Sequence, residues 1–401
     1  MKLFRIIATL LLMAGAVSCM EDDDTMPDSQ VTVAPGGVLL AGRSGAESSL
    51  RLAADTSWEL IVPENSDFAV TPSSGAAGLH SVTVRALSEN PERGNRSLGA
   101  IILAETNGSR RQIPVLQAPA VAEQSLFIVL SGTGNLSSFF TKNINETVTG
   151  IGDIALERGR VLIFRQENTD GYLLEARYNP VDRAGQLDTL RRYHEICSTE
   201  PAALSAIFSD MVGEAPARSY GLIMGSHATA WVPSSHLNLY SLRPAQDDYW
   251  TPGPGAELTR WYGADRQIAM DIDVLAQCIE SAGVSFDYLI FDACFMSSIE
   301  TLYALRHAAG RIVASPCEIM AYGFPYHRLM AALFDSEAHY DLTACCKAFY
   351  DYYATTSTTR KSGCTALTLC DRLEDLADVV ARINRTKLNP CDADALQSYE
   401  G

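Results

Sequence analysis

The chain has 401 residues, of which 47 % are apolar, and its formal net charge at pH 7 is −17. This length and composition provide for two or three domains with hydrophobic cores, which excludes a mainly disordered chain. An acidic chain without a basic cluster also lacks the positive surface that nucleic acids require, so we expect no nucleic-acid partner.

Residues 1–18 have the pattern of a targeting segment. Lys2 and Arg5 precede a short apolar stretch that ends in small residues before Cys19. The stretch is shorter than the ~20 residues that a membrane-spanning helix needs. It resembles a bacterial lipoprotein signal peptide, and the acidic residues 21–24 resemble the tag of Bacteroidetes lipoproteins exposed at the cell surface. The resemblance implies cleavage before Cys19, a lipid on Cys19 and anchoring in the outer membrane; an ordinary secreted protein is the alternative.

Residues 19–30 are acidic and polar and indicate a tether, and residues 31–119 predict a small β-sandwich. "SLRLAADTSWELIV" and "HSVTVRAL" alternate between apolar and polar residues, and the turn sequences "ENPERGN" and "TNGSR" separate the predicted strands. Short strands at this spacing favour an immunoglobulin-like sandwich. Ser57-Trp58, "VTPSSGAAG" and the closing "VLQAP" resemble a BACON domain, which implies a glycan or protein partner. We expect Trp58 in the core rather than on a sugar-binding face.

Residues 120–401 have a different pattern, in which short apolar runs without alternation are separated by helical stretches. Strands that are buried on both faces and joined by helices are typical of a mostly parallel α/β sheet. The predicted strands are "SLFIVLSG", "RVLIFRQ", "YGLIMGSH", "FDYLIFDAC", "RIVASPC" and a late "GCTALTLCD".

Two chemically reactive residues follow predicted strands of this sheet. His227 follows "YGLIMGS", and Cys294 follows "FDYLIFDA", just before a predicted helix. Ligands bind beyond the carboxyl ends of parallel strands, and neighbouring strands would bring the thiol and the imidazole together there. A thiolate is a competent nucleophile, a helix N-terminus favours the anion, and an imidazole can take the thiol proton. The pair therefore predicts nucleophilic catalysis, against the alternative of two structural residues.

The residues around this pair resemble the clostripain family of cysteine peptidases, which has a caspase-like fold. The matching motifs are "GLIMGSHATAW", "DYLIFDACFMSSIE" and "IVASPCEIMAYGFPY", and the likeness extends from about Leu126 to about Asn384. The resemblance implies that His227 is the catalytic histidine and Cys294 the nucleophile. It also implies that Asp292 forms the floor of a pocket for arginine or lysine before the scissile bond, with Glu318 as a candidate second acid of that pocket.

Ala228 departs from the family pattern, which usually has glycine after the histidine. The backbone N–H groups of Ala228 and Cys294 are the predicted oxyanion donors, and a methyl group at Ala228 would distort that site if the backbone there required a positive φ. The alternative to an active peptidase is therefore a non-catalytic surface protein that binds carbohydrate or protein on a peptidase fold.

Other chemistry finds little support in the sequence. There is no Gly-x-Ser-x-Gly elbow, no His-x-x-x-His spacing and no regular spacing among the ten cysteines, which we expect to be mostly free and buried. The catalytic chemistry requires no cofactor, although some relatives need calcium, for which the sequence assigns no ligands. Family members are often processed by their own activity between the two motifs, where Arg243, Arg260 and Arg266 are candidate cleavage sites.

Overall fold

The structure, a computed structural model, describes residues 37–132, 134–180, 182–228, 263, 269–335, 339–355 and 363–387. The predicted signal peptide, Cys19 and the acidic tether lie outside these residues. So do the three arginines considered as processing sites, Arg243, Arg260 and Arg266. None of the helices in the described ranges is long and apolar enough to cross a membrane.

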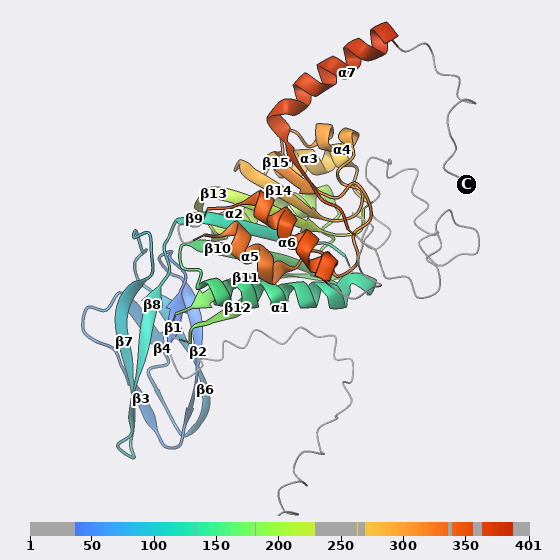
Figure 1. The fold of residues 1–401 in the computed structure, drawn as a ribbon. Helices are drawn as coiled ribbons and strands as arrows, with labels where there is room; N and C mark the ends of the chain where they lie inside the picture. Colours follow the sequence, from blue (N-terminus) through green and yellow to red (C-terminus); the bar gives the residue numbers. More distant parts are fainter. Residues whose placement is uncertain are drawn as a thin grey trace, which may run out of the picture. The chain divides into compact units, whose positions relative to one another are not determined.

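The N-terminal region consists of two β-sheets (Figure 1). The five-stranded sheet has the order β1 (Val38–Leu40), β8 (Arg110–Gln117), β7 (Arg96–Glu105), β3 (Trp58–Ile61) and β5 (Ser74–Gly75). The three-stranded sheet has the order β2 (Glu47–Ala54), β6 (Gly78–Ala86) and β4 (Phe68–Thr71). This arrangement agrees with the all-β region expected from the alternating sequence.

Along the strands of these sheets, alternate side chains point into the space between the two sheets. In β6, Val82, Val84 and Ala86 are buried and the residues between them are exposed. They belong to one core cluster with Trp58, which is 3 % exposed. Trp58 is therefore a core residue, as expected.

The second sheet has eight strands, and most of them are parallel. Its order is β12 (Ala184–Tyr193), β11 (Asp170–Asn179), β10 (Gly159–Glu167), β9 (Ala122–Leu130), β13 (Ala217–Gly225), β14 (Phe286–Asp292), β15 (Ala309–Ala314) and β16 (Ala366–Leu369). The five strands from β10 to β15 are parallel to one another, while β11, β12 and β16 run antiparallel to their neighbours. The fold is thus the mostly parallel, caspase-like sheet flanked by helices that the sequence predicts.

Helices cover both faces of this sheet. On the face turned toward the viewer in Figure 1 lie α1 (Ser137–Ile154), α5 (Tyr326–Leu333) and α6 (Leu342–Thr355). The other face carries α2 (Pro201–Glu214), α3 (Ile272–Glu280) and α4 (Ile299–Ala304). Two short 3₁₀ turns, η1 (Gly134–Leu136) and η4 (Cys370–Arg372), precede α1 and α7 (Leu373–Lys387).

The two faces of strand β14 pack against different helices. Leu289 and Phe291 belong to one core cluster with Phe208 of α2 and Leu275 of α3. Because side chains alternate along a strand, Tyr288, Ile290 and Asp292 point to the opposite face, where α1 and α5 lie. This alternation turns Asp292 toward α5.

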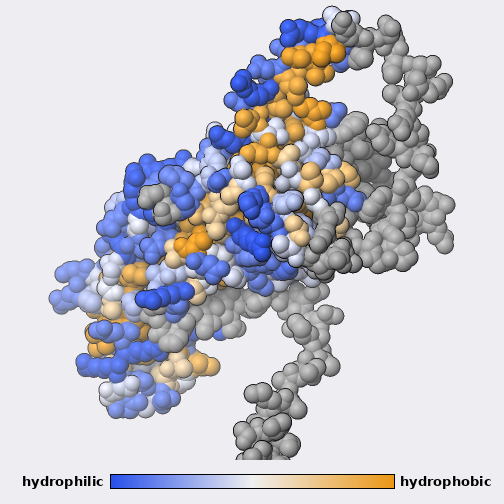
Figure 2. Space-filling view, in the orientation of Figure 1, coloured by the Kyte–Doolittle hydropathy of each residue, from blue (hydrophilic) through white to orange (hydrophobic). Residues whose placement is uncertain are grey.

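Helix α7 exposes apolar residues along one side, and Figure 2 shows hydrophobic surface over it. Leu376, Val379, Val380 and Ile383 are each 41–48 % exposed and recur at helical spacing. The first turn of α7 is held to α4 through Glu374, which accepts hydrogen bonds from Tyr303 and Arg306.

Candidate active site

Strands β13 and β14 bring the two predicted catalytic residues to the same edge of the sheet. The strands are parallel neighbours, and Gly225 at the end of β13 is in register with Asp292 at the end of β14. His227 and Cys294 each follow two residues later. The strands thus meet the condition of adjacency on which the sequence argument depended, and both residues lie beyond the carboxyl edge, where ligands bind in parallel sheets.

The imidazole of His227 has a partner that the sequence analysis missed. Nε2 of His227 lies 3.0 Å from Oδ1 of Asn135, which belongs to the turn η1 directly after β9. An amide oxygen accepts a hydrogen bond, so this contact favours the neutral tautomer that carries its proton on Nε2. This is the tautomer in which Nδ1 can take a proton from a thiol.

Asn135 follows a strand end in the same way as His227 and Cys294. Strand β9 lies next to β13 in the sheet, so three consecutive strands, β9, β13 and β14, supply the three residues. The signal was present in "SLFIVLSGTGN", where a polar residue follows a buried strand.

Ala228 is buried, and its backbone is not strained. The described non-glycine residues with positive φ include Phe295 at 60° but not Ala228. The position therefore does not require glycine, and the methyl group forces no left-handed conformation on the predicted oxyanion donor. The expected distortion of the oxyanion donor by the Ala228 methyl group therefore has no support in the backbone.

The thiol of Cys294 is fully enclosed, with no exposed surface. The backbone N–H of Ile319 donates to Sγ at 3.3 Å, and Sγ lies 3.8 Å from the carbonyl oxygen of Ile319. The sulfur thus accepts one hydrogen bond from the Ile319 backbone and donates another to it, which fixes its position. A substrate reaches this sulfur only if the surrounding chain moves aside.

The segment after Cys294 is a turn rather than the start of a helix. Helix α4 begins at Ile299, five residues after Cys294, with Ser298 as its N-cap; the Ser298 hydroxyl accepts from the Thr301 N–H. The expectation that Cys294 directly precedes a helix was therefore wrong, because Ser298 caps the helix and the preceding residues form a turn. Phe295, in the left-handed conformation, donates its N–H to the Cys317 carbonyl at 3.0 Å.

The two predicted pocket acids lie on either side of this turn. Asp292 ends β14, has no exposed surface, and its Oδ2 accepts a hydrogen bond from the hydroxyl of Tyr326 at 3.0 Å. Glu318 is half-buried and stands between Cys317 and Ile319, whose backbones hold the Cys294 turn. Burial raises the pKa of the Glu318 carboxyl.

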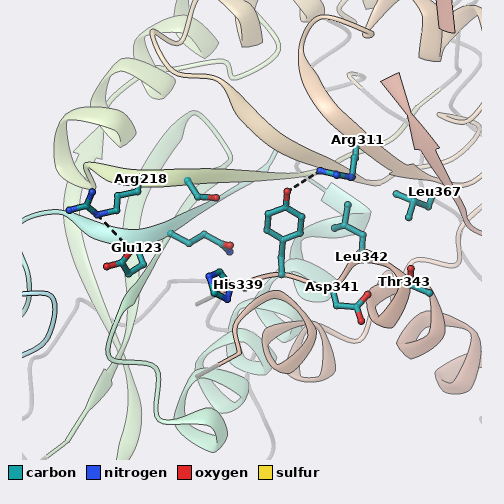
Figure 3. A pocket seen from close by; sticks show the side chains of 11 residues that line it. Glu123, Arg218, Arg311, His339, Asp341, Leu342, Thr343 and Leu367 are labelled. Carbon is teal, nitrogen blue, oxygen red and sulfur yellow. Dashed lines mark hydrogen bonds and ion pairs between the residues drawn. The ribbon is translucent and has the colours of Figure 1, made fainter. Parts of the chain in front are cut away.

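A cavity of about 610 Å³ lies at the other edge of the sheet, near the amino ends of β9, β13 and β15 (Figure 3). Arg218 pairs with Glu123 there, and Arg311 donates to the Tyr340 hydroxyl. None of the predicted site residues lines this cavity.

Metal binding has no support in the described part of the chain. No three histidine, cysteine, aspartate or glutamate side chains within the described ranges come together in a way that would hold a metal ion.

Comparison with known proteins agrees with this architecture. A model of the Clostripain family matches residues 128–389. A secreted C11 cysteine protease from Bacteroides thetaiotaomicron, "iotapain", is 30 % identical over 67 % of this chain and 71 % of its own, with a TM-score of 0.57. An inactive zymogen C11 protease from Parabacteroides distasonis is 28 % identical over 70 % of this chain and 72 % of its own, with a TM-score of 0.55. None of the curated proteins matches the chain.

A second secreted C11 cysteine protease from Bacteroides thetaiotaomicron was solved in complex with an irreversible peptide inhibitor. It is 22 % identical to this chain over 66 % of its length and 71 % of the other, with a TM-score of 0.53. At this identity the likeness shows a shared fold.

Proposed function

The chain belongs to the clostripain family of cysteine peptidases, and on this basis we propose that it cleaves peptide bonds after arginine or lysine with Cys294 and His227. The observation that carries the proposal is the parallel pairing of β13 with β14, which sets His227 and Cys294 beyond the same sheet edge. The Asn135 oxygen at Nε2 supports the role of His227, because it leaves Nδ1 as the base.

The reaction follows from these groups. Nδ1 of His227 takes the proton from Sγ of Cys294, and the thiolate attacks the carbonyl carbon of the scissile bond. The oxyanion accepts hydrogen bonds from the N–H groups of Ala228 and Cys294. The imidazolium then protonates the leaving amine, and a water deprotonated by His227 hydrolyses the thioester and restores the thiol.

The preference for a basic side chain rests on Asp292. Asp292 ends β14 two residues before the proposed nucleophile, and a substrate guanidinium or ammonium would add a cationic partner to this buried, hydrogen-bonded carboxylate. Glu318 is the second acid of this pocket in our proposal, since its neighbours Cys317 and Ile319 contact the nucleophile turn.

The proposed location is the outer cell surface, with the chain anchored through a lipid on Cys19. The two Bacteroides thetaiotaomicron relatives are secreted proteases, which supports a site of action outside the cytoplasm. We assign the N-terminal sheets to a BACON-type domain with a glycan or protein partner.

Self-processing is part of the proposal, with cleavage after Arg243, Arg260 or Arg266. The enclosed thiol supports it, because a site without exposed sulfur needs a change before a substrate enters. The relative from Parabacteroides distasonis was solved as an inactive zymogen.

Intact-mass spectrometry tests the nucleophile and the self-processing together. Purified wild-type protein and Cys294→Ala are incubated with a peptide that ends in lysine and carries a thiol-reactive group. We expect one adduct, mapped to Cys294, and chain cleavage between the two motifs in the wild type alone. Labelling at another cysteine would remove Cys294 as the nucleophile, and equal cleavage of both proteins would remove self-processing.

A further inference from the structure

Asp292 and Tyr326 form a fully buried pair close to the turn that follows Cys294. Neither residue has exposed surface, and the Tyr326 hydroxyl donates to Oδ2 of Asp292 at 3.0 Å. Tyr326 is the first residue of α5, on the face of the sheet to which Asp292 points. A buried tyrosine ring fills space whether or not it carries a hydroxyl. The role of this hydrogen bond can therefore be tested separately from the packing of the ring.

Helix α1 contacts the first two residues of α5, Tyr326 and His327. The backbone N–H of Tyr326 donates to Oε2 of Glu146 at 3.1 Å, so a carboxylate satisfies one of the unpaired N–H groups at the start of α5. Four residues further along α1, Gly150 faces the carbonyl of His327, and a Cβ at Gly150 would lie 2.7 Å from that oxygen. Tyr326 therefore lies where helices α1 and α5 are in close contact.

We propose that Tyr326 is a positioning residue for substrate specificity, which holds the Asp292 carboxylate in the orientation that receives a basic side chain. This inference rests on the proposed function of Asp292. The hydroxyl donates one hydrogen bond to Oδ2 and thereby stabilises the buried anion and fixes its plane. A carboxylate offers about four acceptor positions, so the hydrogen bond from Tyr326 occupies only one of them.

The test is Tyr326→Phe, which keeps the ring and removes the hydroxyl. Tyr353→Phe is the matched control, because Tyr353 is also buried and its hydroxyl donates to the backbone carbonyl of Gly323 at 2.7 Å rather than to a carboxylate. We measure KM and kcat with arginine and lysine reporters. We also measure the rate at which iodoacetamide alkylates Cys294, because this small reagent reacts without binding in the pocket.

We expect Tyr326→Phe to raise KM about tenfold, equivalent to about 1.4 kcal/mol of binding. In the same variant kcat and the alkylation rate should stay within about twofold of wild type, the pattern of lost ground-state binding. Tyr353→Phe should leave KM unchanged. An unchanged KM in Tyr326→Phe, or an equal loss of kcat and alkylation in both variants, would overturn the proposal in favour of a purely structural tyrosine.

The variant Asp292→Asn distinguishes failure of the inference about Tyr326 from failure of the proposed function of Asp292. If the pocket assignment holds, Asp292→Asn raises KM for basic reporters more than Tyr326→Phe does. If Asp292→Asn leaves KM unchanged, the assignment of Asp292 is wrong and the inference about Tyr326 falls with it. If Asp292→Asn has its effect and Tyr326→Phe has none, the pocket stands and only the positioning role is lost.

Discussion

Asn135, His227 and Cys294 follow three neighbouring strands and form the reaction centre that we propose. The Asn135 oxygen determines which imidazole nitrogen carries the proton, and the Ile319 N–H determines where the sulfur rests. Each contact acts on a group that we propose to react rather than on the substrate. A substitution at Asn135 should therefore change the rate of chemistry and leave substrate affinity nearly intact.

We predict that Asn135→Ala lowers kcat about 10- to 100-fold with little change in KM. Complete general acid–base catalysis contributes about 10²–10⁴-fold, and loss of the orienting oxygen leaves the base itself in place. Asn135→Asp, which keeps an acceptor oxygen, should retain more activity than Asn135→Ala. Asn145→Ala on the exposed side of α1 is the control. Wild-type kcat in Asn135→Ala would show that the 3.0 Å contact has no catalytic role.

Two features at the residue scale could not be read from the sequence. His227 and Asn135, which form a hydrogen bond, are 92 positions apart in the chain. Their contact depends on the order of the strands, and the sequence does not reveal that β9 lies next to β13. The conformation of Ala228 is equally hidden, because alanine is compatible with both allowed regions of negative φ. By contrast, the strand-end placement of His227 and Cys294 was predictable, because each follows an uninterrupted apolar run.

At the scale of the elements, the helices α1 and α5 support the proposed pocket. Gly150 lets the two helices approach, since a Cβ there would also lie 2.9 Å from Cγ of Met330. A side chain at this position must displace backbone or core atoms.

We predict that Gly150→Ala destabilises the protein by about 1–3 kcal/mol through overpacking. Gly213→Ala in α2 is the matched control, because nothing lies within 4 Å of the added Cβ and alanine favours a helix by up to about 1 kcal/mol. Chemical denaturation of both variants gives the comparison. A Gly150→Ala protein as stable as Gly213→Ala would contradict the close packing of α1 on α5.

The sequence predicted the parallel strands better than the antiparallel ones. Strands β9, β10, β13, β14 and β15 appear as apolar runs because both of their faces are buried. The strand β12 at the edge of the sheet is mostly polar and half-exposed, so neither an apolar run nor a clear alternation marks it. Helix α4 is short and starts only after a capped turn, which is why its start was placed too early.

At the scale of the whole molecule, the charge of the chain agrees with the proposed substrates. A net charge of −17 attracts cationic peptides at long range and raises their association rate, an effect that salt screens. None of the eight described cysteines forms a disulfide, and five of them are buried, in agreement with the expectation from their spacing. Cys294 is thus distinguished by its strand end and its hydrogen bonds rather than by exposure.

The most direct test of the central claim is the hydrolysis of matched peptide reporters by residues 20–401. The reporters carry arginine, lysine, aspartate or leucine before the scissile bond, and wild type is compared with Cys294→Ala. Our account predicts cleavage after arginine or lysine alone, and none in Cys294→Ala. Cleavage after aspartate or leucine would contradict the role of Asp292, and cleavage by Cys294→Ala would contradict the proposed nucleophile.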